Sequence, residues 1–531
     1  MRLHRLYGLV VLHLTLQSTF ALLNVLEQHV EIDLSDYGRN TTFTYKLYLA
    51  EGNVVVNVAN ATNGRFFVIQ AHSFQSNNIT LSKTETPTLG SYVVGTNIGM
   101  VETPLNSDEV YRYYINYVDK ANIQVLLSVI LYGDEDPIPG GCNMVYNTKN
   151  APYQVLTYDD YMIQVDAAPA LDFSCDISYP HLDMYHMYLS EGNSDINAYF
   201  DAIQKMMTVD GIKKYARKVS DTLYQKSLRR YYSAYPGTGS VYAIIATSGN
   251  ASSAYVPAAT YACDVSNWDE SCLGPVSVIW KVICAVILFM GAFMCLFGHR
   301  FFKIEMFVFG FVCGSFISYV SSPFADAPSA SSSLGFAVAF GCCYGCIWLF
   351  FWWRFGIPIL SVFVPVFFTG YIIGCALYYT GLGDLRLFQS DLNYWSSFFT
   401  IIVVTMMSLL FITVFANILS CSVIGATAIV IAIDHYIGGT IHYVIINNIR
   451  RATITNFNLA ILDPPYQYKD ITLGVVWVVL VISGVVVQRK QQVGKPPFPP
   501  HRAAVADIAE RTPLLSNAPL NYNIENRRAY T

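Results

Sequence analysis

The chain has 531 residues and a net charge of -5, with 53% hydrophobic and only 13% charged residues. A soluble globular protein carries about 25% charged residues, so the composition excludes an ordinary soluble protein. The sequence also contains no basic block long enough to indicate a nucleic-acid partner. The deficit is local, because residues 273–488 contain only fifteen Asp, Glu, Lys and Arg.

The first 21 residues have the features of a cleaved secretory signal peptide. A basic start at residues 2–5 precedes an apolar core at residues 6–16, which is too short to span a bilayer. The small residues around Ala21 predict cleavage after it. A retained signal anchor is the alternative, but the polar residues 17–19 end the apolar run early.

Residues 22–272 are expected to form a β-rich ectodomain in the lumen or outside the cell. Short β-branched or aromatic segments separated by Gly, Asn, Ser or Pro predict tandem β-sandwiches. Periodic apolar residues over 195–219 predict a helical insert, which Asp210-Gly211 is expected to divide into two helices. The predicted strands are 42–49, 53–58, 65–71, 122–132, 161–165, 185–189 and 241–247.

Four of the twelve cysteines precede the first apolar segment, namely Cys142, Cys175, Cys263 and Cys272. In an oxidising compartment they indicate two disulfides, for which three pairings are possible. Cys142–Cys175 and Cys263–Cys272 are favoured because each closes a modest loop. The eight cysteines in apolar segments are interpreted as small packing residues, and no metal or other cofactor is expected.

Four Asn-x-Ser/Thr sequons occur, and all lie between the signal peptide and the first apolar segment. Their shared position predicts glycosylation of a lumenal domain. The acceptor residues are Asn40, Asn60, Asn78 and Asn250.

Residues 273–488 are predicted to form a bundle of seven transmembrane helices in the lipid bilayer. Seven crossings would place the N-terminus outside and the tail, 489–531, in the cytosol, consistent with the positive-inside rule. Arg450 and Arg451 are an exception on the outer side, where Asp463, Lys469 and Asp470 could neutralise them. The expected spans are 275–297, 300–320, 334–353, 356–379, 395–416, 420–443 and 470–488.

Small-residue motifs recur in three successive predicted spans. Two glycines four positions apart lie on one helix face and allow close approach of backbones. Packing within one chain is the favoured interpretation, and a homodimer face is the alternative. The pairs are Gly310 with Gly314, Gly341 with Gly345, and Gly370 with Gly374.

Charged residues inside the predicted spans need a physical explanation, because they are costly at mid-depth. Lys281 lies near the outer end and can extend to the surface, and Glu305 lies near the cytosolic end beside Lys303. Asp434, followed by His435, is either buried or near the outer surface, depending on whether Gly438-Gly439 ends the helix. A structural role at a helix end is favoured over an ion or proton site.

The tail contains an acidic residue four positions before a Leu-Leu pair. The motif consists of Glu510, Leu514 and Leu515, and it resembles the dileucine signal that clathrin adaptors bind. It predicts a protein that reaches the plasma membrane and cycles to endosomes or lysosomes.

No catalytic motif is found in the sequence. A Gly-x-Ser-x-Gly elbow, a His-Glu-x-x-His pair and a P-loop are all absent, so the chain is not expected to be an enzyme. A G-protein-coupled receptor is disfavoured because the predicted third and seventh spans lack the Asp-Arg-Tyr and Asn-Pro-x-x-Tyr motifs of that class.

Several runs closely resemble the transmembrane 7 superfamily member 3 family, in the same order and regions. The glycine-rich spans are also similar to the membrane domain of transmembrane protein 198. The matching runs are 136–143, 254–263, 297–303, 352–357 and 510–515. The resemblance implies a non-enzymatic membrane protein associated with cell survival under stress and with damping of the unfolded-protein response.

Three functional hypotheses follow. The first is a stress-homeostasis protein whose ectodomain binds a protein or lipid partner. The second is an orphan seven-transmembrane receptor, which a wide cytosolic opening would favour. The third is a channel or transporter that uses Asp434, which a polar cavity reaching that residue would favour.

Overall fold

The computed structural model describes residues 28–499 except 40, 50–53, 62–63, 76, 89, 105–108, 118–121, 143–151, 173, 176–179, 191, 220–227, 273–277 and 322–329. The chain forms two compact units. The first consists of the described parts of Met1–Ile283, Leu377–Tyr394 and Asp434–Ile471. The second consists of the described parts of Cys284–Ala376, Trp395–Ile433 and Thr472–Thr531.

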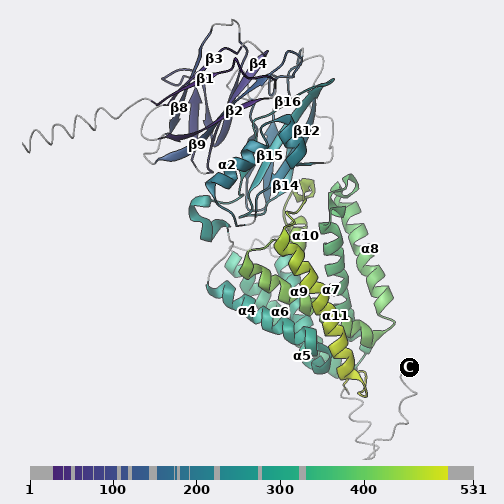
Figure 1. The fold of residues 1–531 in the computed structure, drawn as a ribbon. Helices are drawn as coiled ribbons and strands as arrows, with labels where there is room; N and C mark the ends of the chain where they lie inside the picture. Colours follow the sequence, from purple (N-terminus) through teal and green to yellow (C-terminus); the bar gives the residue numbers. More distant parts are fainter. Residues whose placement is uncertain are drawn as a thin grey trace, which may run out of the picture. The chain divides into compact units, whose positions relative to one another are not determined.

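Four β-sheets make up most of the first unit (Figure 1). Sheet 1 contains β1 (Gln28–Asp33), β3 (Val54–Ala59), β8 (Tyr111–Tyr117), β5 (Ile79–Ser82) and β6 (Tyr92–Gly95). Sheet 2 contains β2 (Thr42–Leu49), β9 (Ile123–Tyr132), β4 (Phe66–Ser73) and β7 (Asn97–Glu102). Sheet 3 contains β13 (Arg217–Lys218), β12 (His181–Tyr188), β15 (Ser240–Ser248), β16 (Ala251–Ala254) and, beside β15, β17 (Ala258–Thr260). Sheet 4 contains β10 (Val155–Tyr158), β11 (Met162–Ala167), β14 (Leu228–Ser233) and β18 (Ala460–Ile461).

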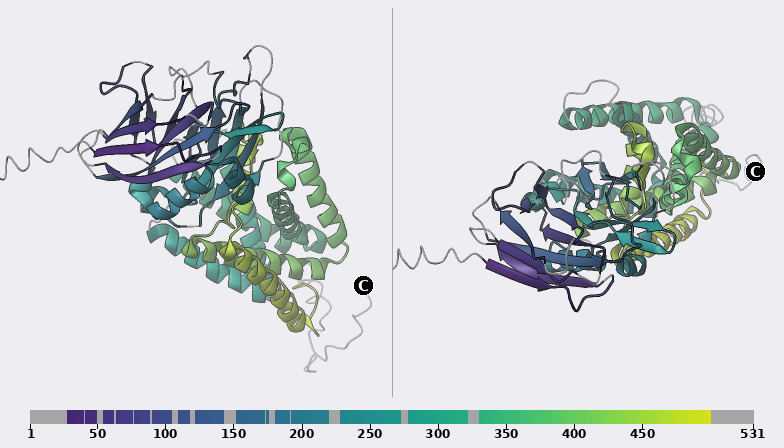
Figure 2. Two further views of the ribbon diagram at one scale, coloured as in Figure 1. Left: turned by 45° about the horizontal axis from the view of Figure 1, so that its top comes forward. Right: turned by 90° about the horizontal axis from the view of Figure 1, so that it is seen from above.

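The two central sheets are buried on both faces. Along β9, Val125, Leu127 and Val129 join the core against sheet 1, whereas Leu126 and Ile130 join the core shared with the second lobe. Side chains alternate between the faces of a strand, so one strand serves two cores. β15 does the same between sheets 3 and 4. The strands therefore form adjoining layers, purple to blue in the N-terminal lobe and teal in the second lobe (Figure 2).

Two helices complete the core between the lobes. α2 (Ile196–Lys205) and α3 (Val209–Tyr215) contribute buried residues to the same cluster as sheets 2 and 3. The break between them was predicted at Asp210-Gly211 but lies at residues 206–208, because the Thr208 side chain accepts from Gly211 N and caps α3. The strands otherwise lie within a few residues of the predicted positions.

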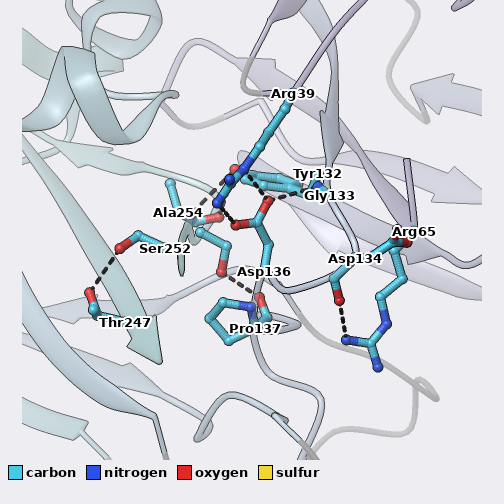
Figure 3. A network of polar contacts seen from close by, with 11 residues as sticks. Arg39, Arg65, Tyr132, Gly133, Asp134, Asp136, Pro137, Thr247, Ser252 and Ala254 are labelled. Atoms are coloured by element: carbon cyan, nitrogen blue, oxygen red, sulfur yellow. Dashed lines mark hydrogen bonds and ion pairs between the residues drawn. The ribbon is translucent and has the colours of Figure 1, made fainter. Parts of the chain in front are cut away.

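An ion pair between a buried aspartate and an exposed arginine fixes the connection between the lobes (Figure 3). Asp136 is fully buried; its side chain pairs with Arg39 of the N-terminal lobe and accepts from Gly133 N at 2.7 Å. In the next residue, the Pro137 carbonyl accepts from Ser253 Oγ at 2.5 Å. The two lobes therefore meet through specific polar contacts as well as a common apolar core.

Two disulfides cross-link the second lobe. Cys142 is bonded to Cys175, and Cys263 to Cys272. This is the pairing favoured by the loop lengths, and it is typical of an oxidising compartment.

A buried histidine lies close to the contact between the lobes. His72 Nδ1 is 2.9 Å from Asn97 Oδ1, and Asn97 Nδ2 lies 3.4 Å from both Tyr199 Oη and the Ala259 carbonyl of the second lobe. Burial lowers the pKa of His72 to about 4, and the hydrogen bond with Asn97 opposes this only in part.

We expect acid to destabilise the first unit through His72. Below pH 6.5 the unfolded chain binds a proton that the folded chain takes up only near pH 4, so stability present at neutral pH is lost as the pH falls through this window. The loss attributable to His72 is at most about 3 kcal/mol. Thermal unfolding of the full chain measured across this range should be less acid-sensitive for His72→Gln than for the wild type. Equal sensitivity would contradict the assignment.

Six described stretches are long and apolar enough to cross a membrane. The sequence predicts seven segments, but the first two form one stretch, Trp280–Ser321, of 42 residues. It contains α4 (Val278–Phe297), the turn Gly298–Phe301 and α5 (Phe302–Ser321). The other long helices are α6 (Ala330–Phe355), α7 (Pro358–Tyr379), α8 (Asp391–Leu409), α9 (Thr413–Ile437) and α11 (Tyr468–Gln492). The predicted break between 416 and 420 was wrong and lies at residues 410–412.

The predicted glycines lie at close helix contacts in the second unit. A Cβ at Gly310 of α5 would lie 2.8 Å from Gly345 Cα of α6, and one at Gly314 would lie 3.2 Å from Gly341 Cα. A Cβ at Gly370 or Gly374 of α7 would meet Ile402 or Phe398 of α8 at 3.1 and 2.9 Å. These contacts join helices of one chain.

Candidate functional site

The segment between two membrane helices is part of the β-structure of the first unit. It contains α10 (Tyr443–Thr453), the turn Phe457–Leu459 and β18, and it leads into α11. β18 extends sheet 4 by pairing in parallel with β14, with Ala460 opposite Tyr231 and Ile461 opposite Tyr232. The second lobe therefore obtains an edge strand from a segment more than 200 residues later in the sequence.

Arg450 of α10 is buried beneath this contact. Its guanidinium donates to the carbonyl oxygens of Ala234 at 2.8 Å and Asp160 at 3.1 Å. It also lies over the ring of Tyr443, 5.0 Å from the centroid. Arg has five donors in a fixed plane, which explains how one side chain can bind two separate backbone segments of the second lobe.

The expected neutralisation of the two arginines by the end of their own loop was wrong. Arg450 binds carbonyls, and Arg451 pairs with Asp391 at the start of α8. Asp470 instead accepts from Thr440 N and Oγ1 and from Gln467 N, which fixes the start of α11. The sequence suggested these partners only because they are close along the chain.

Asp463 links the same segment to sheet 3. Its carboxylate is 2.7 Å from His186 Nε2 of β12 and pairs with Arg217. Its backbone is held as well, because Tyr188 Oη donates to its carbonyl at 2.9 Å and Asp384 accepts from its N–H at 3.1 Å. Burial raises the pKa of Asp384, and hydrogen bonds from two backbone N–H groups to its carboxylate oppose this rise in part.

A groove of about 400 Å³ opens beside this ion pair. One wall is the end of β12 with Tyr215 and Arg217, and the other is Asp463–Gln467. Tyr215 and Tyr466 are about half exposed, at 46% and 50%. The groove therefore combines aromatic faces, two prolines and a charged pair, and its lining comes from both sheet 3 and the α10–α11 segment.

Asp434 lies in the last turn of α9, where its side chain binds the segment that follows the helix. The helix ends at Ile437, followed by Gly438 in a left-handed conformation with φ of 64°. The Asp434 carboxylate is fully buried and accepts from His442 N at 3.1 Å and Nδ1 at 2.6 Å. Its partner is His442; His435 is half-buried beside Tyr436. Neither of the two described cavities is lined by Asp434.

The remaining predicted residues fall into two groups. Asn60, Asn78 and Asn250 are exposed on the first unit, where an enzyme could reach them. The signal peptide, Asn40 and the sorting residues Glu510, Leu514 and Leu515 lie outside the described residues.

Three family models match this chain. "TM7SF3-like, N-terminal immunoglobulin-like domain" covers residues 36–132 and "TM7SF3-like, second immunoglobulin-like domain" covers 137–266, which correspond to the two lobes. "TM7S3/TM198-like domain" covers 284–489. Transmembrane 7 superfamily member 3 of Mus musculus is 30% identical over 458 residues, 83% of this chain and 81% of the relative.

The chain belongs to the transmembrane 7 superfamily member 3 family. The Rattus norvegicus and Homo sapiens members are 30% and 29% identical over the same share of this chain and over 81% and 80% of their own length. A comparison with solved structures aligned the glycoside hydrolase domain of Endo-D from Streptococcus pneumoniae R6 at 10% identity, covering 41% of this chain and 33% of that one. The TM-score of 0.12 is too low to indicate a common fold.

The family's two immunoglobulin-like lobes are therefore joined here to a segment from its membrane domain. Sequence reasoning missed α10, because its Asn447, Asn448 and Arg450 resemble loop residues rather than a buried helix face. The one available signal was that Arg450 and Arg451 broke the positive-inside pattern.

Proposed function

We propose that this chain is a non-enzymatic seven-pass membrane glycoprotein whose ectodomain binds a protein partner at the groove beside Asp463. A partner bound there would contact the α10–α11 segment directly. By family resemblance, the role would be to support cell survival by limiting stress and the unfolded-protein response.

One observation carries this proposal: β18 and Asp463 belong to the ectodomain fold and lie within a few residues of the start of α11. A partner that occupies the groove contacts both walls, so its binding energy depends on their separation. Exposed tyrosines, prolines and a charged pair suit a polypeptide segment better than a lipid chain, because aromatic side chains are enriched at protein interfaces.

A paired substitution tests the proposal in cells that lack the endogenous protein. Tyr215→Ala with Tyr466→Ala should fail to restore a normal unfolded-protein-response reporter, while wild type and Tyr45→Ala should restore it. Tyr45 is a suitable control because it is 45% exposed in β2, outside the groove. Photocrosslinking from Tyr215 would identify the partner. Full rescue by the double variant would exclude the groove.

The 42-residue first stretch supports the proposed seven-pass topology. A straight helix of that length would extend about 63 Å, twice the roughly 30 Å of a hydrocarbon core. The turn at Gly298–Phe301 divides it into two segments of spanning length. Two crossings there would give seven in total, which is compatible with the proposed orientation of an outer N-terminus and a cytosolic C-terminus.

We expect the ectodomain to carry glycans at the exposed sequons. Endoglycosidase treatment should increase the gel mobility of the wild type and leave a variant with Asn→Gln at Asn40, Asn60, Asn78 and Asn250 unchanged. Absence of any shift in the wild type would rule out the proposed orientation.

The tail motif leads to a trafficking prediction. Leu514→Ala with Leu515→Ala should increase the surface fraction and slow uptake of an antibody against the ectodomain, because an adaptor would lose its two apolar anchors. Plasma membrane cycling to endosomes or lysosomes would then depend on clathrin adaptors. Unchanged uptake would show that no adaptor binds the motif.

A further inference from the structure

Glu305 places a carboxyl group in the apolar interior of the second unit. It lies in the first turn of α5 and has 0% exposed surface. Asn417 and Cys421 of α9 are its polar neighbours, yet neither carboxyl oxygen has a hydrogen-bond partner within the part of the chain that the structure describes. An ionised carboxylate without a partner is strongly disfavoured in such surroundings.

Glu305 lies near a helix end, as the sequence predicted, but it does not face the same way as Lys303. The sequence placed it beside Lys303 near a helix end. In the structure Lys303 is exposed while Glu305 faces the interior, and no ion pair between them is found among the described residues. The carboxyl must therefore be neutral or bind a cation.

A short polar path leads from Glu305 toward the end of α11 at which the C-terminal tail begins. Asn417 Nδ2 lies 3.0 Å from His299 Nδ1, so the Asn amide donates to a neutral imidazole. The other atom of that amide, Asn417 Oδ1, is buried and has no hydrogen-bond partner among the described residues. The backbone at His299 is fixed in turn, because its backbone N–H donates to Gln488 Oε1 at 3.0 Å.

A cavity of about 160 Å³ lies at the end of this path. His299 and Gln488 line its inner side, and Lys495–Pro499 lines its outer side. The Phe498 ring packs against His299, Phe302 and Trp352, with centroid distances of 5.8, 5.2 and 6.0 Å. Gln492 Nε2 donates to the Pro496 carbonyl at 2.7 Å and holds the segment in place.

We propose that Glu305 is a proton-binding site that exchanges with the tail side through Asn417 and His299, and that Phe498 closes this route. A proton bound to one Glu305 oxygen would give that carboxyl a hydrogen-bond donor, and Asn417 Oδ1 is the unpartnered acceptor on the neighbouring side chain. A proton is favoured over a metal cation because no group of three or more acidic, His or Cys ligands is found in the described residues.

The titratable groups around Glu305 are few. His299 comes from the turn before α5, Cys421 from α9, and Cys295 of α4 lies next to Cys421. None of them supplies a positive charge to Glu305, because His299 Nδ1 accepts from Asn417 and a cysteine is never cationic. Glu305 itself is therefore the group expected to hold the proton.

Infrared spectroscopy of the purified full chain tests the site without requiring a reagent to enter it. The wild type should show the carbonyl stretch of a protonated carboxylic acid at neutral pH, and Glu305→Gln should lack it. Asp434→Asn is the matched control and should leave the band unchanged, because that carboxyl accepts two hydrogen bonds from His442. If Glu305→Gln does not fold, Glu305→Asp should move the band instead.

The route is tested by exchange into heavy water, which shifts the same band. Phe498→Ala should exchange faster than the wild type, whereas Phe336→Ala, an exposed ring on α6, should not. A wild type with no band that depends on Glu305, or a band that sodium or potassium ions abolish, would overturn the proton site. Equal exchange rates in the wild type and Phe498→Ala would overturn the role of Phe498.

Discussion

Gly425→Leu is expected to disrupt the membrane domain more than substitution of any glycine in the predicted motifs. A Cβ at Gly425 of α9 would lie 2.5 Å from Cys295 N and 2.7 Å from Gly291 O, both backbone atoms of α4. Backbone atoms cannot rotate away as a side chain can, so the helices must separate. We expect a loss of about 3 kcal/mol, the upper end for overpacking.

The measurement is thermal unfolding of the purified chain in detergent, together with its surface level. Gly474→Leu is the matched control, because a Cβ at this glycine of α11 meets nothing within 4 Å. Gly345→Leu should lie between them, since its Cβ would be 2.8 Å from Phe307 O and 2.9 Å from the Phe307 ring. Equal stability of Gly425→Leu and Gly474→Leu would refute the close contact.

Arg450→Leu is expected to destabilise the first unit by about 3 kcal/mol. The carbonyls of Ala234 and Asp160 would remain buried without their donor, and each orphaned acceptor costs about 1–3 kcal/mol. Arg450→Lys should recover only part of the loss, because one ammonium group cannot bind both carbonyls in the same plane.

Hydrogen exchange of the full chain provides the readout. Protection of the backbone amides in β14 and β18 should fall in Arg450→Leu, because the side chain joins α10 to the end of β14. Arg112→Leu is the control: that arginine is exposed on β8, where it donates to Asn57. Protection that stays at the wild-type level in Arg450→Leu would show that the arginine is not required there.

The strands were predictable because their local pattern survives in the fold. β2 was predicted with its observed bounds, Thr42–Leu49, from its β-branched and aromatic residues; it lies at the edge of sheet 2 with only Leu47 and Leu49 buried. β4, buried at every position, was still found from its β-branched and aromatic residues. What could not be predicted was that its two faces serve different cores, because that depends on a lobe not adjacent to it in sequence.

The functional site was largely hidden from the sequence for the same reason. Asp463 pairs with His186 and Arg217, which lie more than 240 residues earlier, and no local pattern connects such positions. The break between α8 and α9 at residues 410–412 also lacks a Gly or Pro signal. By contrast, the left-handed Gly438 that ends α9 was identified as one of two possible ends.

The late arrival of β18 has a consequence for biosynthesis. The chain is made from its N-terminus, so β14 is synthesised long before residues 460 and 461. Until then, sheet 4 has an unpaired edge, which is the kind of surface that pairs with other chains and aggregates. Sheet 4 can be completed only after the segment between α9 and α11 has been made. A complete sheet 4 therefore requires that the segment between α9 and α11 has reached the second lobe.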